Sequence, residues 1–490
     1  MSYFLGIDLG ASSLKASVID AEASLVASVT QGLVSRAPAA LQVEQNPADW
    51  RAALFQALAS LRQEQADVFA QISAISFSGG AHIGVLQDAQ GEVLRPAIMW
   101  SDQRASQQAQ TLQSENIEAS TGNRPNPTWT LAQLLWLQEH EPETMQRVAR
   151  ISFAKDWLRS QLTGDWQTDA SEAVGAMLAD YRAATQAQQW DAGLLERVGL
   201  SVAHMPPIVD MRASAGTLTP EAAQATGLPA SVSVYQGAID TSVEWLCCGA
   251  LDDTTASLKL ASAGVLAFTT ADDTPHPPVS LYPHILPAHH YHAAGMNNCA
   301  SALQWVRQLY LGDMSPSDMD QLAASAPLGS DGVVFYPYLN GERAPLWDAS
   351  LTASLQGLTR ATDQACIARA AYEGVGHALR EIFDDMAHRL ATRPDCLHVL
   401  GGGAQSPFWA QMLADMLGVT IKCGQQTDCS FATALLALSA HRGDADMVKI
   451  AGAAYRPERI FTPDKSTFSD YALAHLGFLA GRIGVGEKSI

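Results

Sequence analysis

Apolar and small residues alternate with polar ones in three short runs at the start of the chain. The runs are residues 3–9, 14–19 and 25–30. A period of two is typical of half-buried strands, so three consecutive strands are predicted. A helix is expected next, because Asn46 can cap it, Pro47 suits its first position, and apolar residues then recur at helical spacing. The apolar run 72–77 predicts a further strand.

A similar order of apolar runs returns in the second half. It predicts strands at 257–260, 265–269, 332–339 and 397–400, a long helix from about 363 to 390, and a helix at 408–417. Two α/β domains are therefore predicted, residues 1–248 and residues 249–490, the second with a helical segment at its C-terminal end. The length of 490 residues agrees with two cores. A ligand site is expected at the junction of the domains.

The composition argues against nucleic acids and membranes as binding partners. The chain has 30 Lys and Arg against 50 Asp and Glu, a formal net charge of −20, which opposes non-specific binding to nucleic acid or anionic membranes. Seven cysteines without a C-x-x-C pair indicate reduced thiols. No signal-like segment or membrane-length apolar run occurs, so a cytoplasmic protein is expected.

The turn between the first two predicted strands has the residues of a phosphate-binding loop. Gly10 would let the main chain approach a phosphate, and Ser12, Ser13 and Lys15 can donate to its oxygens. Asp8, where the first strand ends, could hold a cation. The same pattern is common in ordinary turns, so a structural interpretation stays open here.

Asp240 follows a predicted strand just before the domain junction. A carboxylate there could accept the proton of a sugar hydroxyl and act as the general base of phosphoryl transfer. The alternative is that Asp240 caps the helix that begins with Thr241 and Ser242.

Two glycine-containing turns in the second half could bind a nucleotide. The first lies between two strands, and the second separates a strand from a helix, where three consecutive glycines leave a flat surface for a base or ribose. The candidate nucleotide-binding residues in these turns are Ser262, Gly264, Gly402, Gly403, Ala404 and Ser406.

A polar group in the first half has the chemistry of a sugar site. His82, Asp102 and Arg104 supply oriented hydrogen bonds, and Trp100 offers an aromatic face for the carbon-bound hydrogens of a sugar. The alternative for Asp102 and Arg104 is a surface ion pair of little energetic weight.

Five histidines between residues 276 and 292 could bind a transition metal. Because no carboxylate or thiol at ligand spacing accompanies them, a loop is expected instead. The adjacent pair Cys247 and Cys248 is interpreted as packing.

Together and in this order, these segments resemble the FGGY carbohydrate kinases, members of the wider superfamily that includes actin, hexokinase and the heat-shock chaperone ATPases. The motifs that carry the likeness are Asp8-Leu9-Gly10-Ala11-Ser12-Ser13, Gly237-Ala238-Ile239-Asp240, Gly341-Glu342-Arg343-Ala344-Pro345 and Gly402-Gly403-Ala404. The resemblance implies two actin-like (ribonuclease H-like) domains with a cleft between them, and the use of ATP and Mg²⁺. It also implies that Asp240 is the base, that Asp8 and Asp240 hold the metal, and that Ala81 and His82 contact the sugar.

Within that family the segment Leu94 to Arg104 is most similar to the xylulokinases. This likeness favours phosphorylation of a ketopentose, D-xylulose to D-xylulose 5-phosphate. A small-molecule sugar is the expected partner, with no nucleic acid and no membrane, and a homodimer is possible. The chain departs from those enzymes at Gly80-Ala81-His82, where they usually show Gln-Met-His. Another open-chain sugar or sugar acid (ribulose, erythritol, gluconate) therefore stays open. So does a non-catalytic, nucleotide-switched binding protein of the same fold.

Overall fold

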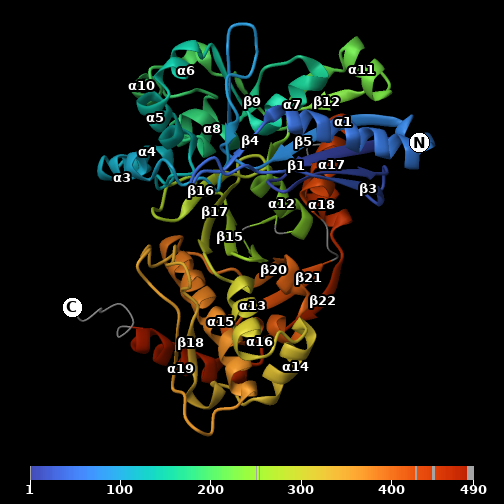
Figure 1. Cartoon of the computed structure of the whole chain (residues 1–490). Coiled ribbons are helices and arrows are strands. Elements are labelled where there is room, and N and C mark those ends of the chain that lie inside the picture. Colours follow the sequence, from blue (N-terminus) through green and yellow to red (C-terminus); the bar gives the residue numbers. More distant parts are fainter. Residues whose placement is uncertain (1, 250, 253, 425–427, 444–446, 483–490) are drawn as a thin grey trace.

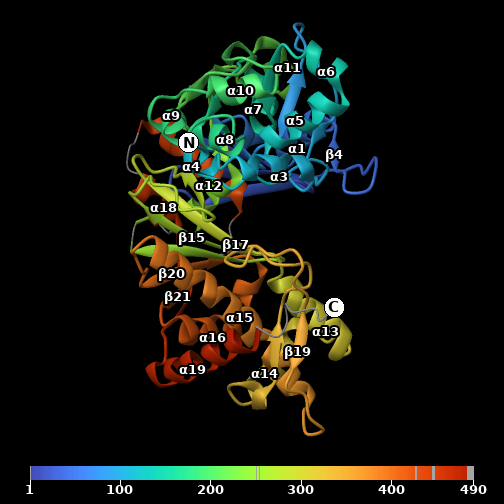
Figure 2. The ribbon, with the colours of Figure 1, turned by 90° about the vertical axis from the view of Figure 1, so that its left-hand side faces the viewer.

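The computed structural model describes residues 2–249, 251–252, 254–424, 428–443 and 447–482. Figure 1 shows two lobes, an upper one coloured mostly blue to green and a lower one mostly yellow to red. The quarter turn in Figure 2 shows the same division, with strands β15 and β17 at the top of the lower lobe. The expected two-domain α/β architecture is confirmed.

The upper lobe is built on a mixed sheet whose order is β11-β12-β5-β1-β2-β3, with β13 beside β5. Its strands are β1 (Tyr3–Leu9), β2 (Ser13–Ile19), β3 (Leu25–Gly32), β5 (Ile72–Gly79), β11 (Ser214–Thr217), β12 (Ser233–Tyr235) and β13 (Ala238–Ile239). The three predicted N-terminal strands are present and form an antiparallel meander, and β5 runs parallel to β1. Helix α1 (Pro47–Glu64) begins as predicted, since the Asn46 side chain accepts from the N–H of Ala48 at 3.0 Å.

The lower lobe repeats this arrangement in a sheet of order β16-β17-β15-β14-β20-β21-β22. Its strands are β14 (Thr255–Leu260), β15 (Gly264–Thr270), β16 (Ser280–Pro283), β17 (His290–Met296), β20 (Cys396–Leu400), β21 (Thr420–Gly424) and β22 (Pro457–Phe461). Here β14 pairs antiparallel with β15 and parallel with β20, as β1 does with β2 and β5. The long helix α15 (Gln364–Arg389) lies where it was expected, and Asp363 caps it.

One expected strand of the second half is wrong. Residues 334–336 form only the short strand β18, which pairs with β19 outside the main sheet, and the third strand is instead β17, in the histidine-rich stretch expected to be a loop. The histidines of β17 are accommodated because they find partners: Nδ1 of His290 bonds to the Tyr181 hydroxyl at 2.6 Å, and Nε2 of His292 to the Asp272 carbonyl at 3.2 Å.

Two helices join the lobes. Helix α12 (Asp240–Cys248) follows the upper sheet and packs against α17 (Cys429–Arg442), which comes from the second half of the sequence yet lies on the upper sheet (Figure 1). Gly6 in β1 permits this contact, since a Cβ there would lie 2.0 Å from the Ser430 carbonyl oxygen. The core of the upper lobe is therefore completed by a segment from the other end of the chain.

The remaining elements surround these sheets. In the upper lobe they are β4 (Glu44–Gln45), α2 (Ala66–Phe69), β6 (Gly84–Gln87), β7 (Ala97–Ile98), α3 (Ser106–Ser114), α4 (Glu118–Thr121), α5 (Thr130–His140), α6 (Pro142–Arg147), β8 (Arg150–Phe153), α7 (Ala154–Thr163), β9 (Thr168–Asp169), α8 (Ala170–Gly175), α9 (Tyr181–Gln186), α10 (Ala192–Arg197), β10 (Ile208–Val209) and α11 (Pro220–Thr226). In the second half they are α13 (Ala300–Tyr310), α14 (Pro316–Ser325), β18 (Val334–Tyr336), β19 (Ser354–Gln356), α16 (Pro407–Leu417), α18 (Met447–Ala454) and α19 (Lys465–Arg482). Among the described residues, no helix combines the length and apolar character that a membrane crossing needs.

Candidate active site

Two carboxylates lie where the lobes meet: Asp8, which is buried, and Asp240, which is half-buried. Asp8 is near the end of β1 and accepts from the Ser78 hydroxyl at 2.8 Å; that hydroxyl in turn accepts from Thr433 of α17 at 2.7 Å. Asp240 is the first residue of α12, and one of its oxygens accepts from the N–H of Thr241 at 2.6 Å. The N-cap of α12 is Ile239, without a side-chain cap, so the capping alternative for Asp240 is wrong.

The two acids repel each other. Burial raises the pKa of Asp240 from an ordinary 3.8 to about 7, and the charge of Asp8 adds to this rise. Burial likewise raises the pKa of Asp8 to about 6, against the Ser78 hydrogen bond, and Asp428 and Glu244 contribute in the same direction. A site with this much uncompensated negative charge favours a proton or a cation.

A glycine sets the direction in which Asp240 leaves the sheet. Gly237 has φ +80°, and a Cβ there would lie 1.7 Å from the carbonyl oxygen of Phe77 in β5. The close approach of this turn to β5 places the start of α12 at the carboxyl end of the strand.

Each lobe contributes a lysine that is paired with an acid of a connecting helix. Lys15, on β2, lies 3.2 Å from Asp428, the N-cap of α17, and Lys259, on β14, lies 2.7 Å from Glu244 of α12. The Lys15 pair is 38% exposed on both sides, so it holds the ammonium weakly, by less than about 1 kcal/mol. Lys15 can therefore turn toward a phosphate.

The predicted phosphate turns occupy equivalent places in the two sheets. Ser12 lies between β1 and β2 and Ser262 between β14 and β15, both exposed. The Ser12 carbonyl accepts from the N–H of Leu33, and the Ser262 carbonyl accepts from the N–H of Cys299 at 2.9 Å. Both main chains are thereby fixed while the serine side chains stay available to a ligand. Gly10 and Ser13 close the first turn through a 3.0 Å hydrogen bond between their main chains.

The three-glycine turn abuts the end of β14. Gly401 has φ +89°, and a Cβ on it would lie 2.6 Å from the carbonyl oxygen of Leu260. Gly402 and Gly403 then begin a short 3₁₀ segment, Gly402–Gln405, in which Ala404 is buried. Ser406 caps α16 by accepting from the N–H of Trp409 at 3.0 Å. Gly264, whose Cβ would meet Met296 at 3.0 Å, lies on the other side of β14.

His82 is held in a left-handed backbone conformation, φ +52°, by several contacts. Its N–H donates to Glu172 at 3.0 Å, its carbonyl accepts from Thr130 at 2.9 Å, and its ring stacks on Trp129. Such strain persists only where surroundings impose it, often at ligand sites. Burial lowers the pKa of His82 to about 4, so its ring is neutral near pH 7.

The tautomer of His82 follows from its partner. Nδ1 lies 3.0 Å from the carbonyl oxygen of Thr128, which can only accept, so Nδ1 carries the hydrogen. Nε2 is then left as an acceptor suited to a hydroxyl group of a sugar.

Glu172 is a site residue that the sequence reasoning missed. It is fully buried on α8, one oxygen accepts from His82, and the other has no hydrogen-bond partner among the described residues. Burial raises its pKa well above the ordinary value, opposed by Lys155. Tyr282 lies within electrostatic reach of both Glu172 and Asp240, which connects the His82 group to the acid pair. The sequence offered one signal for this residue: Glu172 is an acid among the small and apolar residues of α8 (Ala170–Gly175).

Ala81 and Trp100 accompany His82, whereas Asp102 and Arg104 do not contact it. A Cβ on Gly175 would lie 3.7 Å from Ala81 and 3.6 Å from His82, and one on Gly80 would lie 3.5 Å from Trp100. Trp100 is 47% exposed.

Asp102 and Arg104 form a buried ion pair, so the surface interpretation was wrong. Asp102 is fully buried and binds Arg104 through both oxygens, at 2.9 and 2.8 Å, and also the N–H of Val43. Arg104 further contacts Glu44 at 2.8 Å. Since these bonds occupy the polar atoms, any contact with a sugar from this pair remains a prediction.

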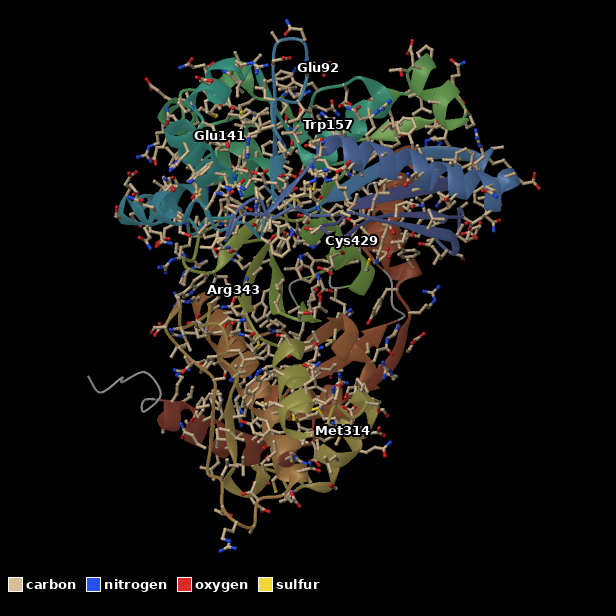
Figure 3. All side chains as sticks on the ribbon, in the orientation of Figure 1. Glu92, Glu141, Trp157, Met314, Arg343 and Cys429 are labelled. Carbon is tan, nitrogen blue, oxygen red and sulfur yellow. The ribbon has the colours of Figure 1, made fainter. Side chains whose placement is uncertain are left out.

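The histidine stretch and the cysteines give no metal centre among the described residues, where no group of three or more His, Cys, Asp or Glu could hold an ion. His276 does have a carboxylate partner, Asp272 at 3.0 Å, contrary to expectation. Cys247 is buried, as expected, whereas the side chain of Cys248 lies outside the described residues. Cys429, labelled at the junction in Figure 3, contacts the Asp240 carbonyl at 3.7 Å.

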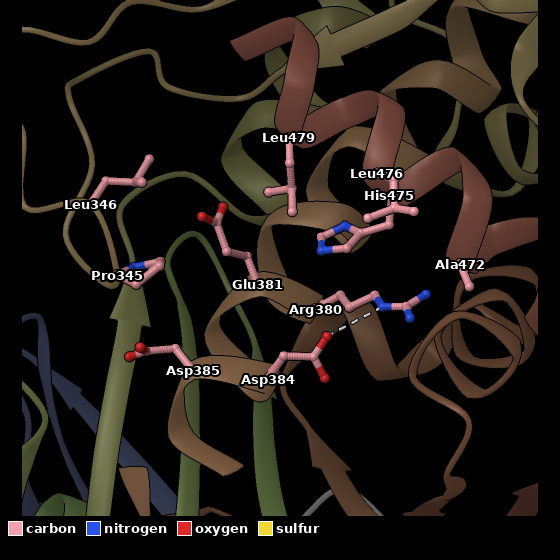
Figure 4. Close-up of a pocket in the computed structure, with 10 residues that line it drawn as sticks. All are labelled: Pro345, Leu346, Arg380, Glu381, Asp384, Asp385, Ala472, His475, Leu476 and Leu479. Carbon is pink, nitrogen blue, oxygen red and sulfur yellow. Dashed lines mark hydrogen bonds and ion pairs between the residues drawn. The ribbon is translucent and has the colours of Figure 1, made fainter. Parts of the chain in front are cut away.

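A cavity of about 640 Å³ lies elsewhere, between α15 and α19. Figure 4 shows its lining, which includes Glu381, Asp385, His475 and Leu479 and none of the predicted site residues. The chemistry concentrates at the junction of the lobes.

Two lobes of one topology, each with a serine turn and with a lysine whose charge acts on Asp8 or Asp240, are typical of phosphotransferases of the actin-like class. Comparisons with known proteins specify the family. Residues 3–247 match the N-terminal domain, and residues 261–440 the C-terminal domain, of the FGGY family of carbohydrate kinases. The chain belongs to this family, and it is an ATP-dependent carbohydrate kinase.

Several relatives are similar over nearly their whole length. The xylulose kinase of Escherichia coli (strain K12) is 32% identical over 468 residues, which cover 94% of this chain and 91% of the relative. A solved structure described as a xyloylose kinase from Brucella ovis is 31% identical, with a TM-score of 0.92 over 98% of this chain and 99% of its own. A ligand-bound xylulose kinase from Lactobacillus acidophilus is 25% identical, with a TM-score of 0.93 over 100% and 99%.

Proposed function

We propose that this kinase phosphorylates D-xylulose at O5 to give D-xylulose 5-phosphate, with Asp240 as the general base. The observation that carries the proposal is the position of Asp240, a half-buried carboxylate at the start of α12 whose pKa is raised to about 7 and on which charges from both lobes act, Asp8 and Lys259. A base with a pKa near the working pH is the most effective proton acceptor. The relatives named as xylulose kinases support the choice of sugar.

In the proposed reaction Asp240 accepts the proton of the sugar hydroxyl as that oxygen attacks the γ-phosphorus of ATP. A new O–P bond forms, the bond to the β–γ bridging oxygen breaks, and its electron pair leaves with ADP. Ser12 and Ser262 would bind phosphate oxygens through their exposed hydroxyls, and the Gly402–Gly403 surface would contact the nucleoside. The N-terminal residues Gly10, Ser13 and Lys15 would complete the cradle.

The acid pair fits Mg²⁺. The charge of Asp8 raises the pKa of Asp240, and burial raises the pKa of Asp8 itself. A hard dication needs only one or two such carboxylates when phosphates and water supply its other ligands. Bound there, the ion would neutralise charge on the phosphates. The residues present would hold it through Asp8 above all, because the Ser78 hydrogen bond orients that carboxylate.

The His82 group favours a neutral polyol over a sugar acid. Nε2 of the neutral His82 ring accepts a hydroxyl hydrogen. A carboxylate ligand would instead need a fixed cation. Lys155, the cation whose charge acts on Glu172, is already held by Asp156 and Asp169 at 2.7 and 2.6 Å. Gluconate is therefore the least favoured of the alternatives.

ADP release tests the proposal with D-xylulose, D-ribulose, erythritol and D-gluconate as acceptors. We expect the highest kcat/KM with D-xylulose, and phosphorus NMR should place the phosphate on C5. A higher kcat/KM with another acceptor would reassign the substrate. ADP release equal with and without every sugar would instead favour a nucleotide-switched binding protein.

A further inference from the structure

Lys259 lies at the point where the two proposed nucleotide turns of the lower lobe come together. In the sheet its register partner on β15 is Val265, directly after Gly264, and its partner on β20 is Leu400, directly before Gly401. The next residue of β14, Leu260, packs against the three-glycine turn. Lys259 is therefore at the rim from which both turns emerge.

The side chain of Lys259 faces the upper lobe. Leu258 and Leu260 are fully buried in the core of the lower lobe, so alternation along the strand directs Lys259 to the opposite face, where α12 lies. Its ammonium group lies 2.7 and 3.0 Å from the two oxygens of Glu244, one helical turn after Asp240. Its charge also acts on Asp240.

The Lys259–Glu244 pair is partly open to solvent. The Lys259 side chain is 35% exposed and that of Glu244 11%. Burial alone would lower the pKa of Lys259, but Glu244 outweighs it and raises this pKa, so the group is a permanent cation. The side chain of Lys259 has four rotatable bonds and is reachable from solvent, and the negative charge of a bound triphosphate would offset the loss of Glu244 as partner.

We propose that Lys259 is a further catalytic residue, which leaves Glu244 to bind the γ-phosphoryl group of ATP and stabilises the charge on that group during transfer. The proposal rests on the phosphate-binding role given above to the Ser262 turn. Lys259 donates no proton in the step; Asp240 accepts the proton of the sugar, and the electron pair of the broken bond leaves with ADP. The lysine supplies positive charge from the lobe opposite Lys15.

Nucleotide binding without sugar provides the test. Affinities for the imido analogue of ATP and for ADP are measured by calorimetry in MgCl₂ for wild type and for Lys259→Met, Lys259→Arg and Glu244→Gln. We expect Lys259→Met to weaken the triphosphate analogue roughly tenfold or more, as loss of a charged hydrogen bond does, and to leave ADP unchanged. Lys259→Arg should restore part of the difference.

Glu244→Gln distinguishes this role from a merely structural ion pair. If Glu244 holds Lys259 only while no nucleotide is bound, Glu244→Gln leaves the affinity for the triphosphate analogue unchanged or raises it. If the pair merely joins α12 to β14, both single variants weaken both nucleotides alike, and that result overturns the proposal. An unchanged preference for the triphosphate in Lys259→Met overturns it too.

The control is Lys422→Met on β21, a half-buried lysine two strands away in the same sheet, which should bind both nucleotides as wild type does. Thermal melts of each variant exclude unfolding as the cause. Because no sugar is present, the outcome is independent of which sugar the enzyme phosphorylates. Ser262→Ala tests separately whether the Ser262 turn binds phosphate. If this variant binds both the triphosphate analogue and ADP as the wild type does, the turn does not bind phosphate.

Discussion

Replacing Asp240 by Asn should make the protein more stable while nearly abolishing its activity. The folded state raises the pKa of this carboxyl from 3.8 to about 7, so above pH 7 folding must hold an ionised carboxylate in surroundings where desolvation and the charge of Asp8 disfavour it. Asn keeps the size and the oxygen that accepts from the N–H of Thr241 but carries no charge. The side chain that performs the proposed chemistry is thus expected to cost stability.

The magnitude follows from the shift in pKa. About 3 units correspond to about 4 kcal/mol of free energy of unfolding at most, and we expect about 2 kcal/mol because buried acids relax toward water. The sign depends on pH. Between pH 4 and 7 the folded state binds more protons here than the unfolded state, so the stability of the wild type falls as pH rises through this window. The advantage of Asp240→Asn should therefore appear above pH 7 and vanish below pH 4.

Thermal melts of both proteins from pH 4 to 9, without metal or nucleotide, measure this difference. A gain of a few degrees at pH 8 is expected, together with a loss of roughly 10² to 10⁴ in kcat, as removal of a general base produces. Asp470→Asn, on the exposed surface of α19, should change neither quantity. Equal or lower stability of Asp240→Asn at pH 8 would refute the repulsion inferred from the structure, and unchanged kcat would refute the role of Asp240 as base.

Three further predictions concern the neighbouring groups. Asp8→Asn should raise the Mg²⁺ concentration for half-maximal activity roughly tenfold or more, and an unaltered Mg²⁺ titration would contradict its role. Glu172→Ala should raise KM for the sugar roughly tenfold, because it releases the strained backbone of His82, and should leave KM for ATP unchanged. Glu172→Gln keeps the acceptor oxygen and should restore most of the affinity for the sugar. Equal KM values for the two variants would exclude this explanation. Gly403→Ala should lower the free energy of unfolding by about 1–3 kcal/mol, because its Cβ would lie 2.5 Å from the Trp409 ring. A Cβ on Gly402 would meet nothing within 4 Å, so the thermal melt of Gly402→Ala should match that of the wild type. Similar melts for both alanine variants would contradict the packing of Gly403 against Trp409.

Strong periodicity made most of the fold predictable. The strands from Tyr3 and Ser13 and the helix capped by Asp363 carry regular apolar patterns and clear caps, so local sequence was sufficient. Strand β17 was missed because its histidines obscure the alternation; they are tolerated only through partners such as Tyr181, distant in sequence.

The glycine turns at Gly10 and Gly401 could be located from the sequence, because glycines directly after an apolar run are a local signal. Glu172 and Lys259 were not predictable, because their significance comes from neighbours brought close by folding. Lys259 meets Glu244 across the junction of the lobes, and Glu172 meets the N–H of His82, 90 positions away. A single sequence shows the residue types but not such pairings.

The position of α17 has a consequence for biosynthesis. The sheet that begins at Tyr3 leaves the ribosome early, yet the helix that covers one of its faces ends at Arg442. During most of translation that apolar face, including Phe4 and Ile19, lacks its native cover, so the nascent polypeptide should need a chaperone or a temporary substitute contact until synthesis is nearly finished. A messenger truncated before codon 429 should accordingly yield an aggregating product rather than a small autonomous domain.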